Sequence, residues 1–91
     1  MAVGDITYDT GWPRQVSNWW EIRGVLSADT TLRGFALGGT KIRLLSCEVV
    51  SEDEVATARV VLNDSAGTAT NGSISVDGEA AGDYRFIATY V

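Results

Sequence analysis

The carboxylates are the first residues of this sequence whose types and spacing could support chemistry. One acidic run covers residues 52–54, and a looser group comprises Asp77, Glu79 and Asp83. Acid–base catalysis needs two carboxylates held across a substrate by different elements, with separated pKa values. Calcium loops need oxygen ligands at regular loop spacings, which the second group matches only loosely. We therefore expect solvated turns at both places, with no catalytic residues and no metal site.

A nucleophile is equally hard to assemble from this sequence. Cys47 is the single cysteine and the chain has no histidine, so a Ser-His or Cys-His pair is impossible within it. The glycine pair in residues 38–41 lacks the spacing of a phosphate-binding loop. A lone thiol also excludes an internal disulfide and has no partners at metal-ligand spacing. We expect a protein that is not an enzyme and that uses no cofactor.

The aromatic residues give a stronger indication, and the stretch Val16–Leu26 is central to it. Alternate side chains of a β-strand point to opposite faces. One face of this stretch then carries Trp20 and Ile22, which we expect in the core, whereas Trp19 points the other way. An aromatic ring on that second face is covered either by another part of the chain or by a partner.

Three aromatic residues are the candidates for a partner interface: Tyr8, Trp12 and Trp19. Trp and Tyr are enriched in protein–protein interfaces, and aromatic rings also stack on sugars. A sugar site usually places several polar side chains beside its aromatic platform, and the sequence does not assemble such a set. A protein partner is therefore favoured over a carbohydrate.

The elements that must position these residues are strands. Four further stretches show strand-like patterns between turn-forming residues: Thr40–Val50, Val55–Asn63, Ser73–Val76 and Tyr84–Val91. This arrangement predicts an all-β fold, a small antiparallel β-sandwich or barrel-like domain with little or no helix.

The positions of apolar and turn-forming residues add detail to this predicted fold. The apolar residues change face at Leu44-Leu45, which predicts a β-bulge. Residues 64–67 have the composition of a turn. Phe35 and Leu37, together with Leu32, are candidates to cover the core. The last strand places Tyr84, Phe86, Ala88 and Tyr90 on one face, and Tyr84 or Tyr90 is a further candidate for an exposed aromatic residue.

Length and charge limit the organisation and the partners. The 91 residues carry a formal net charge of −5, which disfavours nucleic acid and anionic membranes as partners.

Residues 1–13 are expected to be an N-terminal arm or a short edge strand with a linker, and residues 14–91 a single β domain. No signal peptide or membrane span is expected. A core this small favours association into a homo-oligomer.

The two ends of the chain carry a family resemblance. The opening MAVGDITYDTG, the stretch NWWEIRGVL and the closing GDYRFIATYV resemble the small all-β virion structural proteins of tailed bacteriophages. The resemblance implies a head decoration (cement) protein, made in the host cytoplasm and located on the capsid exterior of the virion. Such proteins commonly bind as dimers or trimers and bridge neighbouring copies of the major capsid protein.

Two alternatives remain open from the sequence. A tail, fibre or connector subunit of a phage would share the same composition. A small carbohydrate-binding module would use the same exposed aromatic residues.

Overall fold

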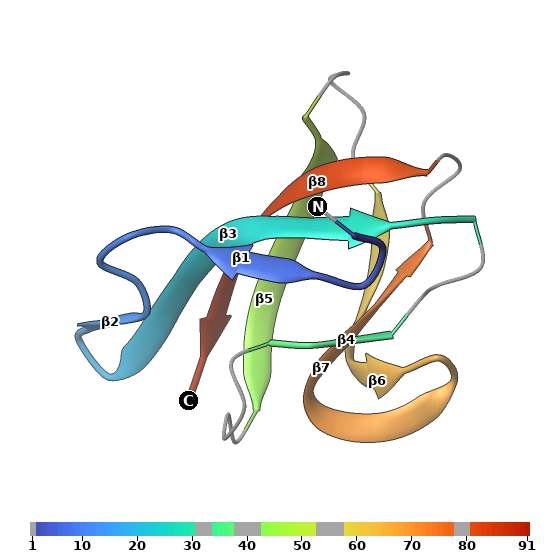
Figure 1. Cartoon of the computed structure of the whole chain (residues 1–91). Helices are drawn as coiled ribbons and strands as arrows, with labels where there is room; N and C mark the ends of the chain where they lie inside the picture. Colours follow the sequence, from blue (N-terminus) through green and yellow to red (C-terminus); the bar gives the residue numbers. More distant parts are fainter. Residues whose placement is uncertain (1, 31–33, 38–42, 53–57, 78–80) are drawn as a thin grey trace.

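The structure is a computed structural model that describes residues 2–30, 34–37, 43–52, 58–77 and 81–91. These residues form two antiparallel β-sheets and contain no helix, so the predicted all-β fold is confirmed (Figure 1). Sheet A consists of β1 (Ile6–Tyr8), β2 (Arg14–Val16), β3 (Trp19–Ala28), β5 (Leu44–Ser51) and β8 (Gly82–Tyr90). Sheet B consists of β4 (Gly34–Ala36), β6 (Arg59–Ser65) and β7 (Thr68–Asp77). Among the described residues, none belongs to a helix long and apolar enough to cross a membrane.

Sheet A is built around the long strand β3, whose two edges are used differently. One edge pairs with β8 from Trp20 to Ala28, and β8 in turn pairs with β5. The other edge is shared by two short strands in tandem, with β2 against Trp19–Glu21 and β1 against Gly24–Leu26. Backbone hydrogen bonds from the Gly4 N–H to the Ser27 carbonyl and from the Asp9 N–H to the Arg23 carbonyl extend the β1 pairing at both ends.

The core lies between the two sheets and follows the alternation of the sequence. In β8 the side chains of Tyr84, Phe86, Ala88 and Tyr90 are buried because they all face sheet B. Tyr84 and Tyr90, which were further candidates for exposed aromatic residues, therefore belong to the core. Sheet B contributes apolar side chains from all three of its strands to the same core. The predicted core residues Phe35 and Leu37 are buried, whereas Leu32 lies outside the described residues.

Strand β5 closes one side of the two-sheet structure. Its pairing with β8 shifts register between Leu44 and Ser46, which confirms the predicted bulge. The Ala58 N–H donates a hydrogen bond of 2.8 Å to the Val49 carbonyl, so the chain entering β6 runs along β5. The fold is therefore a sandwich whose sheets meet at one edge.

The β6–β7 hairpin is longer than its sequence suggests. The predicted turn over residues 64–67 narrows to Ala66 and Gly67, and both have positive φ. Asp64 remains in the ladder because its carboxylate accepts hydrogen bonds from the Ser75 hydroxyl and from the Gly67 N–H. The strand predicted to begin at Val55 is seen from Arg59 onwards, and residues 53–57 lie outside the described part.

Candidate interaction surface on sheet A

Large apolar side chains that remain exposed gather on sheet A. Trp19, Trp20, Leu45 and Val91 lie at one end of this sheet, and we call these four residues the aromatic end. Register holds them together, because Trp20 and Leu44 both pair with Tyr90 and because Val91 exchanges two backbone hydrogen bonds with Arg43. The start of β3, the start of β5 and the C-terminus accordingly lie at the same end of the molecule (Figure 1).

Trp20 was expected in the core, and that prediction is wrong. Its side chain has the predicted phase, because it lies on the inner face and stacks on the Tyr90 ring at 6.3 Å with an interplanar angle of 10°. The residue is nevertheless 39% exposed, whereas Ile22, two positions further along β3, is 1% exposed. Burial on the inner face therefore begins one inward-facing position after Trp20, because full coverage of sheet A does not reach its end.

Trp19 points to the outer face of sheet A, the face turned away from sheet B. It pairs with Val16 across the β2–β3 ladder and remains 39% exposed. The chain therefore covers this indole only in part. The two adjacent tryptophans extend the aromatic end over both faces of the sheet.

Trp12 lies on the outer face, where two arginine side chains contact its ring. The guanidinium carbons of Arg14 and Arg23 lie 4.0 and 4.6 Å from its ring centroid. Cation–π contacts of this kind prefer the electron-rich face of an indole. Trp12 is half-buried, and its ring is thus engaged within the chain.

Tyr8 packs at the margin of the core, away from the aromatic end. Its ring meets Phe86 edge to face, with 6.2 Å between centroids and an interplanar angle of 86°. Gly24, which pairs with Tyr8, makes this possible, since a Cβ there would overlap the Thr7 carbonyl oxygen and lie 3.1 Å from the Phe86 ring.

The three predicted interface residues thus occupy three separate environments. Tyr8 lies at the edge of the core, Trp12 lies among arginines, and Trp19 belongs to the aromatic end. Leu45 and Val91 were missed by the sequence reasoning. The phase change at Leu44-Leu45 contained the signal for Leu45, because the extra residue of a bulge leaves the regular alternation.

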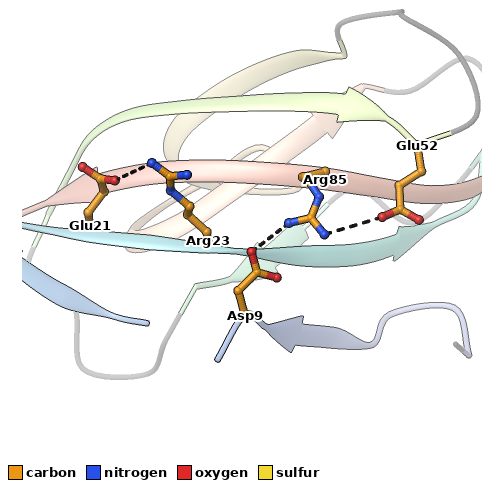
Figure 2. Close-up of polar contacts among 5 residues, drawn as sticks. All are labelled: Asp9, Glu21, Arg23, Glu52 and Arg85. Atoms are coloured by element: carbon orange, nitrogen blue, oxygen red, sulfur yellow. Dashed lines mark hydrogen bonds and ion pairs between the residues drawn. The ribbon is translucent and has the colours of Figure 1, made fainter. Parts of the chain in front are cut away.

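Ion pairs also lie on the outer face of sheet A (Figure 2). Arg23 contacts Glu21 at 3.1 Å, and Arg85 contacts Asp9 at 2.8 Å and Glu52 at 3.9 Å. Exposed ion pairs of this kind contribute little to stability. They leave the outer face open to solvent and patterned with both signs of charge.

A hollow of about 470 Å³ lies on the same face, over strands β5 and β8. The described residues that line it are Glu48, Val50, Ser51, Glu52, Arg85 and Ile87. Ile87 is 40% exposed. We refer to this depression as the β5–β8 hollow.

The surroundings of Cys47 limit the reactivity of its thiol. Burial, and secondarily the charge of Glu48, raises the pKa of the Cys47 thiol to about 12. A thiol that keeps its proton at neutral pH is a poor nucleophile. Among the described residues, no three His, Cys, Asp or Glu side chains are grouped so that they could hold a metal ion.

Comparisons with known proteins found no family model, no curated protein and no solved structure that matches this chain. Its function is therefore inferred from its own residues and geometry.

Proposed function

We propose that the chain is a non-enzymatic assembly protein that docks on another protein through the aromatic end of sheet A. Within this class we favour a head decoration protein of a tailed phage, which bridges copies of the major capsid protein on the capsid exterior. The observation that carries the proposal is the clustering of Trp19, Trp20, Leu45 and Val91, four exposed apolar side chains at one end of one sheet.

The composition of the aromatic end supports a protein partner. Tryptophans at the centre of an interface often account for most of the binding free energy, because they bury a large area with few rotatable bonds. Trp20 is also held in place by its stacking on Tyr90. A ring that is already oriented loses less conformational entropy on binding.

The carbohydrate alternative is less well supported. A sugar platform needs an aromatic face that is free to stack, but Trp12 is engaged by two guanidinium groups and Trp20 is stacked on Tyr90. Trp19 is the remaining tryptophan that could serve as a platform. Glycan-array binding that is lost in Trp19→Ala would overturn the proposed protein partner.

The direct test compares Trp19→Ala with Val61→Ala. Val61 is also exposed, at 52%, but lies on sheet B and serves as the matched control. Binding to shells of the major capsid protein from the same genome is measured by co-sedimentation. We expect Trp19→Ala to weaken binding about 30-fold, which corresponds to the roughly 2 kcal/mol of an aromatic hot spot, while Val61→Ala binds like the parent.

Circular dichroism must show the parent spectrum for Trp19→Ala. A variant that unfolds would place Trp19 in the core and contradict its role in binding. The mass in solution separates the phage alternatives, because a discrete dimer or trimer suits a decoration protein, whereas rings or filaments suit a tail subunit.

A further inference from the structure

We infer that the β5–β8 hollow receives an arginine or lysine side chain of the protein partner. The inference rests on the proposed function, in which sheet A is the docking surface, and adds the chemistry of one contact. It concerns a region separate from the aromatic end, so each can be tested without the other.

The floor of the hollow is apolar. Ile87 on β8 is 40% exposed, and Val50 on the neighbouring strand β5 is half-buried beside it. Both point to the outer face because the residues next to them, Phe86 and Val49, are completely buried on the inner face. The alkyl stem of a long side chain can cover such a floor while its charged head remains at the rim.

The rim carries an excess of negative charge. Glu48 pairs with Ile87 in the ladder, is exposed, and makes no ion pair that involves the described residues. Glu52 lies 3.9 Å from Nη2 of Arg85, whereas Asp9 contacts Nη1 of the same guanidinium at 2.8 Å (Figure 2). Glu48 is thus available to a cation that enters over Ile87, and Glu52, which Arg85 contacts weakly, adds a second negative charge to the rim.

The same geometry disfavours an anionic occupant. Among the described residues that line the hollow, Arg85 is the cation, and it already contacts two carboxylates, Asp9 and Glu52. The chain as a whole carries a net charge of −5, which attracts basic surfaces and repels acidic ones. The complementary occupant is therefore a basic side chain with an apolar stem.

The test uses blocked tripeptides and the full ¹⁵N-labelled chain. Ac-Gly-Arg-Gly-NH₂ is titrated while the backbone amide shifts are followed by NMR, and the citrulline peptide supplies the same shape without charge. We expect saturable shifts around Glu48, Glu52 and Ile87 with the arginine peptide alone. Glu48→Gln combined with Glu52→Gln should raise the dissociation constant about fivefold, as expected for exposed ion pairs.

Glu21→Gln is the control, because it removes one carboxylate charge from the outer face but lies on β3, outside the hollow. It should leave the dissociation constant unchanged. The inference is overturned if the citrulline peptide binds equally, if a glutamate peptide binds instead, or if no residue of the hollow shifts. If Trp19→Ala loses capsid binding but the hollow binds no arginine peptide, only this inference is overturned. If the hollow binds the arginine peptide but Trp19→Ala leaves capsid binding unchanged, the proposed function of the aromatic end is overturned.

Discussion

Cys47 lies on β5, where its side chain packs against the core beside Ala88. Burial there raises the pKa of the thiol from its ordinary value of 9.0 to about 12, and the nearby charge of Glu48 adds to the effect. Between these two values the unfolded chain releases the thiol proton while the folded chain retains it. The free energy of unfolding must therefore decrease as pH rises from about 9 towards 12, and the thiol contributes no pH dependence below that window.

This prediction is checked by urea unfolding of the parent and of Cys47→Ala between pH 7 and pH 11. The difference in unfolding free energy between the two proteins should be constant up to about pH 9, and the parent should then lose stability faster. A thiol reagent at pH 8 should modify Cys47 only after unfolding. Rapid modification of the folded protein would contradict the burial of the thiol.

At the scale of elements, Asn63 joins the two sheets. Its side-chain oxygen accepts hydrogen bonds from the Leu44 N–H at 2.8 Å and from the Gly72 N–H at 3.2 Å, and its amide nitrogen donates to the Leu44 carbonyl at 3.0 Å. Leu44 stands at the bulge of β5 and Gly72 is buried in β7. One side chain thus replaces a strand partner at the point where the register of β5 shifts.

We expect Asn63→Ala to lower the free energy of unfolding by about 2 kcal/mol or more, because it leaves partly buried backbone groups of Leu44 and Gly72 without partners. Asn63→Asp is the matched control, since its carboxylate keeps both acceptor contacts, whereas its second oxygen replaces the donor to the Leu44 carbonyl. At neutral pH, Asn63→Asp should lower the free energy of unfolding less than Asn63→Ala does. Urea unfolding followed by tryptophan fluorescence measures both, and equal losses would show that the two accepted hydrogen bonds are not what matters.

At the scale of the whole molecule, alternation in the sequence predicted which faces are buried but not how far each sheet extends. The alternation of β8 predicted that Tyr84, Phe86, Ala88 and Tyr90 share one face, but it did not predict that both tyrosines are buried. The exposure of Trp20 could not be predicted in the same way, because it depends on where coverage by the opposite sheet ends. The stacking of Trp12 on Arg14 and Arg23 depends on the pairing of β2 with β3, which local sequence does not specify.

The division of one edge of β3 between β1 and β2 has a consequence for polymerisation. An exposed strand edge is a template on which identical chains add without limit, and short, interrupted strands are a common protection against this. Deleting residues 1–9 would uncover the backbone of β3 from Arg23 to Ser27. We expect the shortened chain to form open-ended aggregates that enhance thioflavin T fluorescence.

Tyr8→Ser is the matched control, because it removes the ring packed on Phe86 but keeps the backbone of β1 in place. It should remain in the same discrete species as the parent in size-exclusion chromatography. A shortened chain that behaved likewise would show that the edge needs no protection. Open-ended aggregation of the shortened chain alone would show that residues 1–9 protect the edge of β3.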